Sequence, residues 1–128
     1  MRVVPTGVHA VFDYTASILL VIAPWVFDFA RGGAETWTPV LLGGSGLAYS
    51  LCTDYERGAF RLIPMPIHLL LDVMLGLLLA VSPFLFGFAD YVWAPHVIIG
   101  LATIGLAFTT WRTPAHTKSG AAPVASLY

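Results

Sequence analysis

The sequence predicts an all-α membrane protein with four transmembrane helices. Of its 128 residues, 58% are hydrophobic and 10% are charged, whereas soluble domains carry roughly 25% charged residues. Four stretches contain no Asp, Glu, Lys or Arg: 14–27, 36–53, 73–89 and 91–111. Three of them approach or reach the roughly 17–25 residues that a membrane-spanning helix needs. So few charges could not cover the surface of a soluble domain of this length.

Each predicted helix begins at a proline-containing segment. We expect the helices at about 7–25, 38–54, 66–84 and 95–111. The prolines at their starts are Pro5, Pro39, Pro64, Pro66 and Pro95. Proline suits a helix start because the N–H that it lacks would have no partner there. The helices form a transmembrane domain over residues 1–112, and the small, polar, proline-containing segment 113–128 predicts a flexible C-terminal tail.

The basic residues indicate how the helices are oriented. With four spans, both chain ends and the loop at 55–65 lie on one side of the membrane. That side holds five of the six lysines and arginines: Arg2, Arg57, Arg61, Arg112 and Lys118. Because cytoplasmic loops carry an excess of Lys and Arg, we expect a multi-pass protein of the cell (inner) membrane with cytoplasmic N- and C-termini.

An internal duplication relates the two halves of the chain. His9 and Asp13 recur 59 residues later as His68 and Asp72. At the same offset a second segment recurs, in which Ala23, Pro24 and Trp25 become Ser82, Pro83 and Phe84. We therefore expect two tandem helix hairpins, one at about 7–54 and the other at about 66–111. Since each unit has two helices, the two units are parallel repeats, related by a pseudo-twofold axis along the membrane normal.

The duplicated segments resemble the SPW-repeat family of small integral membrane proteins. In that family a Ser-Pro-Trp motif marks the first of two helices in each repeat. Here the motif stands as Ala23-Pro24-Trp25 and as Ser82-Pro83-Phe84, so each copy departs from it at one position. The resemblance covers the chain up to about Trp111. It implies a membrane location and a two-repeat build, but it brings no established activity and no catalytic residues.

Titratable residues gather at the cytoplasmic ends of the predicted helices. Positions i and i+4 share one helix face, so His9 and Asp13 lie on one face, as do His68 and Asp72. An ionised side chain at the bilayer centre costs on the order of 2.5–3.5 kcal/mol, which predicts that these groups face the bundle interior and pair. Residues at the ends of the second and fourth helices complete the predicted polar cluster, whose members are His9, Asp13, Asp54, Glu56, His68, Asp72 and Arg112.

Three interpretations of this cluster remain open. In the leading one, it is a buried hydrogen-bond network, neutralised in part by Arg112, in a protein with a structural or interaction role as a scaffold or accessory. This interpretation needs no cofactor. In the second, His9, Asp13, His68 and Asp72 hold a divalent metal such as zinc, iron or manganese, or the two histidines bind a haem. In the third, the two aspartates couple transport to protons or ions.

Other classes of function find little support in the sequence. The net charge of −1 provides no basic field for nucleic acid. Cys52 is the single cysteine, which excludes an internal disulfide and a CxxC redox pair. No nucleophile–base pair, phosphate loop or dinucleotide fingerprint occurs, so enzymatic activity is not indicated. The expected partners are the lipid bilayer and either further copies of the chain or a larger membrane complex.

Overall fold

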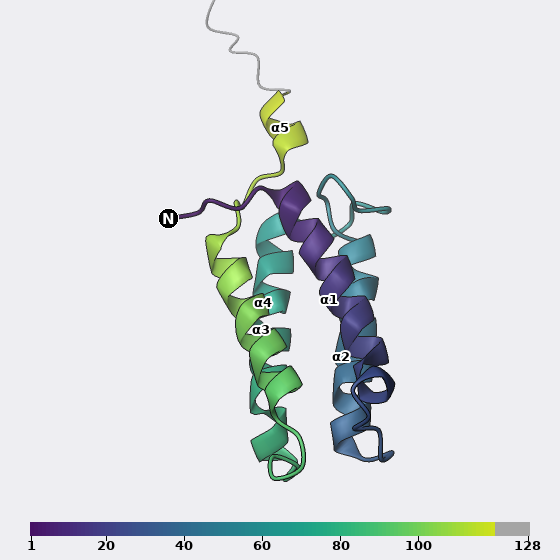
Figure 1. Cartoon of the computed structure of the whole chain (residues 1–128). Coiled ribbons are helices and arrows are strands. Elements are labelled where there is room, and N and C mark those ends of the chain that lie inside the picture. Colours follow the sequence, from purple (N-terminus) through teal and green to yellow (C-terminus); the bar gives the residue numbers. More distant parts are fainter. Residues whose placement is uncertain (120–128) are drawn as a thin grey trace, which may run out of the picture.

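Helices are the regular elements of the chain, which confirms the all-α prediction. The computed structural model describes residues 1–119, and within them the chain forms four long helices and a short one (Figure 1). Their bounds are α1 Thr6–Val26, α2 Ala34–Leu51, α3 Met65–Leu85, α4 Ala94–Thr109 and α5 Ala115–Ser119.

The start of α2 differs most from its predicted bound. This helix begins at Ala34 and not near residue 38. Glu35 Oε1 and Thr36 Oγ1 accept the N–H groups of residues 31–33 at 3.0–3.1 Å, which closes the turn before the helix. These hydrogen bonds hold the preceding loop against the first turn of α2.

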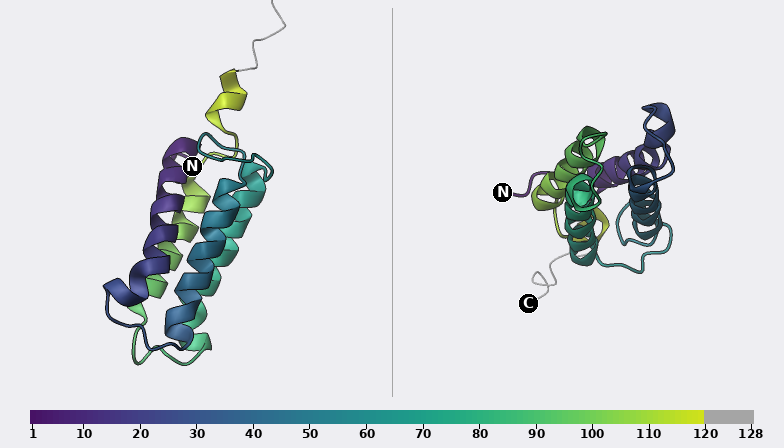
Figure 2. Two further views of the ribbon diagram at one scale, coloured as in Figure 1. Left: turned by 90° about the vertical axis from the view of Figure 1, so that its right-hand side faces the viewer. Right: turned by 90° about the horizontal axis from the view of Figure 1, so that it is seen from below.

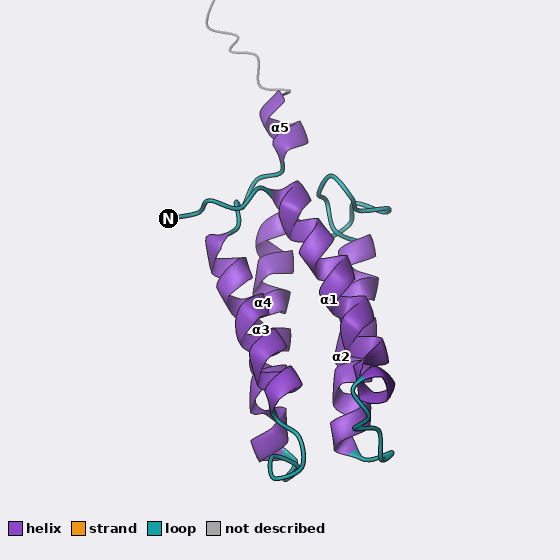
Figure 3. Cartoon of the chain, viewed as in Figure 1, coloured by secondary structure: helices purple, strands orange, loops and turns teal. Residues whose placement is uncertain are grey.

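The second helix of each pair ends earlier than predicted. α2 ends at Leu51 because the next residues enter a loop, in which the carbonyl of Cys52 accepts the N–H groups of residues 62 and 63 at 2.8 Å (Figure 3). α4 ends at Thr109, whose carbonyl accepts the N–H groups of residues 3 and 4 at 2.7 and 3.0 Å. In both cases a segment distant in sequence supplies the hydrogen bonds that a further helical turn would have made.

The predicted C-terminal tail is helical near its start. Ala115–Ser119 forms α5, and the N–H of Ala115 donates to Glu56 Oε1 at 2.6 Å. This contact ties the segment after α4 to the loop between α2 and α3. The rest of the predicted tail, residues 120–128, lies outside the described residues.

The four long helices associate as two hairpins. α1 packs along α2, and α3 packs along α4, whereas contacts between the two pairs are fewer. The N-terminus, the loop between α2 and α3, and α5 lie at one end of the bundle (Figures 1 and 2). The loops within the two hairpins lie at the other end.

The proline-aromatic segments end α1 and α3 in the same way. The carbonyl of Pro24 accepts the N–H groups of residues 29 and 30, and the carbonyl of Pro83 accepts those of residues 88 and 89, all at 2.8–3.0 Å. Asp28 and Gly87, at matching positions, both have positive φ, 56° and 73°. Such a residue commonly closes the end of a helix. Within each motif the first two residues are buried, Ala23 and Pro24 or Ser82 and Pro83, while the aromatic residue, Trp25 or Phe84, is exposed.

A buried histidine holds the two hairpins together at the end distant from the N-terminus. His96 of α4 is 1% exposed, and its Nε2 lies 3.2 Å from the carbonyl oxygen of Glu35 in the other hairpin. Phe29 and Phe88, which follow the two proline-aromatic segments, pack on its ring with centroid separations of 5.6 and 4.9 Å. This end is therefore closed by aromatic packing.

The outer surface of the bundle is apolar and its interior contains polar groups. Large hydrophobic side chains on all four long helices are more than half exposed, among them Phe12, Leu41, Leu70 and Ile98. α1 and α3 are long and apolar enough to cross a membrane, and α4 is a shorter apolar helix. Lipid can solvate such a surface at no cost, whereas water cannot.

Close contact within each hairpin depends on glycine. A Cβ atom on Gly43 would lie 2.7 Å from the carbonyl oxygen of Ser17 in α1, and one on Gly100 would lie 2.5 Å from the carbonyl oxygen of Gly76 in α3. Gly44, the next residue, has open space beside it, because a Cβ atom there would meet no atom within 4 Å. Gly43 thus sets the distance between α1 and α2, and Gly44 does not.

We expect Gly43→Ala to lower the free energy of unfolding by about 1–3 kcal/mol, because the added methyl group must push two backbones apart. Gly44→Ala is the matched control, and it should leave stability unchanged or slightly higher, since alanine favours a helix. Unfolding of both variants in one detergent measures the difference. Equal midpoints would contradict the assignment of Gly43 to the helix contact.

Candidate functional site

Four of the predicted polar residues meet between the hairpins. His9 and Asp13 come from α1, and His68 and Asp72 come from α3. Ligating atoms of the four side chains all lie within 4.8 Å of one another. Both histidines are fully buried, and the side chains of Asp13 and Asp72 are 8% and 2% exposed. We call these four residues the His/Asp centre.

Each histidine of the His/Asp centre contacts both aspartates. His9 Nε2 lies 2.9 Å from Asp72 Oδ2 and 3.2 Å from Asp13 Oδ1. His68 Nε2 lies 3.0 Å from Asp13 Oδ2 and 3.2 Å from Asp72 Oδ2. The two Nε2 atoms are 3.3 Å apart. The centre therefore links α1 to α3, and with them the two halves of the chain.

Two threonines fix the orientation of the histidine rings. Thr110 Oγ1 lies 2.8 Å from His9 Nδ1 and 2.7 Å from the carbonyl oxygen of Leu106. Thr53 Oγ1 likewise lies 2.7 Å from His68 Nδ1 and 2.7 Å from the carbonyl oxygen of Tyr49. A carbonyl can only accept, so each hydroxyl proton goes to the carbonyl and each Nδ1 must carry the proton that the hydroxyl oxygen accepts.

This arrangement leaves the two Nε2 atoms directed at each other and at the carboxylates. If both Nε2 atoms were unprotonated, their lone pairs would face each other and the lone pairs of the carboxylate oxygens at 2.9–3.3 Å. This repulsion is removed when protons or a cation lie between the four groups. Protons on both Nε2 atoms give two imidazolium groups and two carboxylates with no net charge, and a divalent cation bound by all four groups balances the two carboxylates.

Two tyrosines complete the surroundings of the carboxylates. Tyr49 of α2 donates to Asp72 Oδ1 at 2.6 Å, and Tyr55, in the loop after α2, donates to Asp13 Oδ2 at 3.3 Å. Burial raises the pKa of the Tyr55 phenol, so it stays a protonated donor. These tyrosines and the two threonines were not among the site residues predicted from the sequence. The threonines could have been found from one signal in the sequence. Thr53 and Thr110 occupy matching positions, just after the second helix of each hairpin.

The structure places the other three predicted members of the cluster outside the His/Asp centre. Asp54 is at the surface, where its Oδ1 lies 3.2 Å from His116 Nε2 and 4.0 Å from Arg61 Nε. Glu56 accepts hydrogen bonds from Thr6 and Ala115. Arg112 is exposed and forms no ion pair within residues 1–119. The expected neutralisation by Arg112 is not seen, because α4 ends at Thr109 and presents residue 110 to the centre.

Glu56 has a local role at the end of the bundle. Burial acts to raise its pKa, but the hydrogen bonds from Thr6 and Ala115 outweigh burial and hold that pKa below its usual value. The carboxylate is therefore ionised at neutral pH. It joins the start of α1, the loop after α2 and the start of α5.

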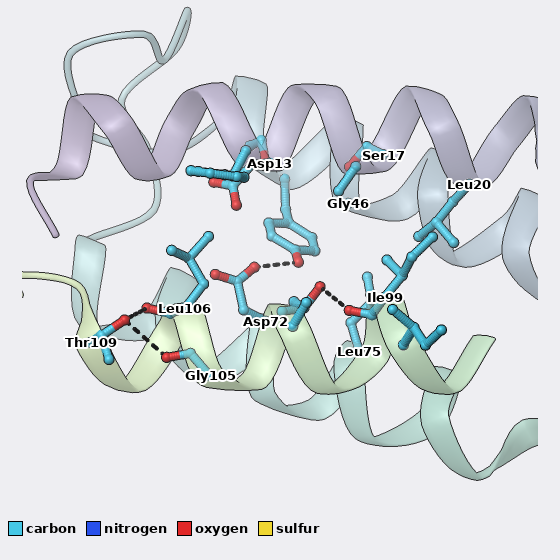
Figure 4. Close-up of a pocket in the computed structure, with 17 residues that line it drawn as sticks. Asp13, Ser17, Leu20, Gly46, Asp72, Leu75, Ile99, Gly105, Leu106 and Thr109 are labelled. Carbon is cyan, nitrogen blue, oxygen red and sulfur yellow. Dashed lines mark hydrogen bonds between the residues drawn. The ribbon is translucent and has the colours of Figure 1, made fainter. Parts of the chain in front are cut away.

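A cavity of about 530 Å³ lies beside the His/Asp centre. Its wall comes mainly from α1 and α4, and the carboxylates of Asp13 and Asp72 point toward the space between the helices (Figure 4). Most of the remaining lining is apolar or small, as with Leu20 and Leu75. Carboxylates at a largely apolar cavity are typical of a ligand site with few orienting polar groups.

The chain matches a known protein family. The family model described as the SPW repeat domain matches residues 7–110, which is well over half of the chain. No curated protein and no solved structure matches the sequence. The matched range includes the whole His/Asp centre and both threonines beside it.

Proposed function

The chain belongs to the SPW repeat domain family, and from this premise we propose that it is a four-pass membrane protein whose two tandem hairpins are joined by a divalent metal ion. The ion is held by His9, Asp13, His68 and Asp72. The protein then serves as a small metal-stabilised scaffold or accessory in the membrane. The inward direction of the two Nε2 atoms carries this proposal.

The proposed topology rests on the surface and on the charges. Exposed tryptophans Trp25, Trp37 and Trp93 lie near the hairpin-loop end, as in an aromatic belt at a membrane interface. The opposite end holds Arg57 and Arg61 in the loop between α2 and α3, together with both ends of the described chain. We assign that end to the cytoplasm, because cytoplasmic loops carry the excess of basic residues.

The metal assignment rests on donor type and spacing. Two imidazole nitrogens and two carboxylates suit zinc first, and iron or manganese as alternatives. A tetrahedral ion with bonds of roughly 2.0–2.1 Å separates its donors by roughly 3.3 Å. The Nε2 atoms are 3.3 Å apart, and each lies 2.9–3.2 Å from the carboxylate oxygens it faces. A small outward movement of the side chains accommodates the ion, while the threonines keep both Nδ1–H groups bonded.

A metal-free ionic network is the second candidate. Its support is that the ring nitrogens of both histidines and both carboxylates all have hydrogen-bond partners in the structure. With a proton on each Nε2, the four groups carry no net charge. Such a network fixes the packing of α1 on α3 and suits a scaffold without a cofactor.

Metal content of the full chain, purified in mild detergent, distinguishes the two candidates. We expect close to one zinc ion per chain after incubation with zinc and removal of excess. His9→Ala and His68→Ala should lose it, whereas His116→Ala, at the surface, should retain it. Folded wild-type protein that takes up no metal at neutral pH would refute the metal centre and favour the network. A haem absorption band lost in the same two variants would assign the histidines to haem.

A further inference from the structure

We propose that the cavity between the hairpins binds a membrane-soluble long-chain alcohol, which enters sideways between α1 and α4 and donates its hydroxyl hydrogen to Asp13. This inference rests on the membrane placement given under the proposed function, and it does not require the metal.

The size and walls of the cavity fit a chain. Its volume of about 530 Å³ lies in the range of roughly 300–1,000 Å³ found for ligand pockets. Phe12 and Leu20 of α1 and Ile98 and Ile99 of α4 supply apolar surface along it. Aliphatic and aromatic walls favour an alkyl or prenyl chain over a polar ligand.

The cavity opens toward the outer surface. Phe12 and Ile98 line it and are 55% and 62% exposed, whereas Leu20 and Asp72 line it and are buried. Exposed lining residues on α1 and α4 place the mouth between these helices, which belong to different hairpins and make few contacts with each other. In a four-pass protein this mouth faces lipid, so the ligand arrives from the bilayer.

Most polar groups that line the cavity can accept a hydrogen bond from a ligand. Tyr49 donates its hydroxyl proton to Asp72, Thr103 donates to the carbonyl of Ile99, and Thr109 donates within α4. These residues and the two carboxylates therefore offer lone pairs to the cavity, while Ser50 Oγ, which also lines it, has no hydrogen-bond partner within residues 1–119 and can donate to the oxygen of a hydroxyl ligand. Asp13 is the more accessible carboxylate, at 8% against 2% for Asp72.

The ligand's head group should be neutral. The His/Asp centre has no net charge when both histidines are protonated, and it also has none when a divalent ion balances the two aspartates. A buried ammonium group would gain no net opposite charge there and would lose its hydration. A hydroxyl group loses less hydration and still donates to the carboxylate.

Photolabelling of the full chain in lipid nanodiscs tests the inference. The reagent is a long-chain alcohol with a diazirine in its chain, and the competitors are the unlabelled alcohol, its methyl ether and the amine of equal length. We expect labels on cavity residues of α1 and α4, and competition by the alcohol about tenfold better than by the ether, which cannot donate. Equal competition by the ether, or stronger competition by the amine, would overturn the proposed head group.

Cavity-filling variants provide the matched control. Ala16→Phe in α1 and Ala102→Phe in α4 both fill the cavity and should reduce labelling at least tenfold. Ala48→Phe, at an exposed site of α2 outside the cavity, should not. Unchanged labelling in both cavity variants would overturn the site. Labelling of protein shown to hold no metal would retain this inference while refuting the metal centre, and metal binding without specific labelling would do the reverse.

Discussion

Replacement of Asp72 by alanine should destabilise the bundle by about 3–5 kcal/mol, the range typical for removing one partner of a buried ion pair. Asp72 is 2% exposed. It accepts a hydrogen bond from Tyr49 and lies 2.9 Å from His9 Nε2 and 3.2 Å from His68 Nε2. Without its carboxylate, two buried imidazoles face a single aspartate, and the Tyr49 hydroxyl loses its acceptor. This loss of stability is expected with or without a bound metal, since both forms of the centre need two carboxylates.

Asp54→Ala is the control for a lost acidic group. Asp54 lies at the surface, where its side chain is 37% exposed and its partners are His116 and Arg61. Exposed pairs contribute roughly 0–1 kcal/mol, so this change should be small. Unfolding of the two variants and the wild type in one detergent measures the contrast. If Asp72→Ala were no more destabilising than Asp54→Ala, the carboxylate would not be part of a buried ionic centre.

The sequence predicted the helices better than their ends. Apolar runs and prolines placed all four long helices, because both signals act within one element. The start of α2 depends on Glu35 and Thr36 folding back onto the preceding loop, and the end of α4 depends on residues 3 and 4 bonding to Thr109. The contact of residues 3 and 4 with Thr109 joins segments that no local pattern relates, whereas the Glu35 and Thr36 hydrogen bonds span two to five residues and were a local signal that the prediction missed.

The same distinction holds for the His/Asp centre. Helical spacing put His9 with Asp13 and His68 with Asp72, and the cost of an ionised side chain in the bilayer predicted that these groups face the bundle interior and pair. Thr53 and Thr110 occupy matching positions in the sequence, but their contacts with the histidines could not be predicted, since these depend on how the ends of α2 and α4 are rotated against the histidines.

Asp54, Glu56 and Arg112 lie outside the His/Asp centre for a related reason. Residues at the same end of a bundle need not reach the same depth. These three follow the last turns of α2 and α4 and lie in the connections beyond them, where solvent and surface partners are available.

We expect Thr110→Val to weaken zinc binding by about 10–100-fold, although the threonine is not a ligand. Loss of an outer partner of a metal-bound histidine has effects of this size. Thr110 Oγ1 accepts the Nδ1 proton of His9. Valine cannot accept it, so the imidazole is no longer held with Nδ1 protonated, and a proton on Nε2 removes the lone pair that would bind the ion.

The adjacent residue offers a close control. Within residues 1–119, Thr109 Oγ1 donates to carbonyls of its own helix, those of Gly105 and Leu106, at 3.0 and 3.1 Å, and contacts neither histidine of the centre. Thr109→Val should therefore leave zinc affinity within about threefold of the wild type, since no outer partner of a histidine is lost. Competition with a chromophoric chelator measures all the affinities under the same conditions.

A second threonine with the same kind of contact makes the prediction stricter. Thr53 Oγ1 accepts the Nδ1 proton of His68, as Thr110 Oγ1 accepts that of His9. Thr53→Val should therefore weaken zinc binding to a similar degree. If the two histidines ligate one ion, the double variant should bind more weakly than either single variant. Affinity that falls in only one single variant would mean that only one histidine ligates the metal, and the ion would then not join the two halves of the chain.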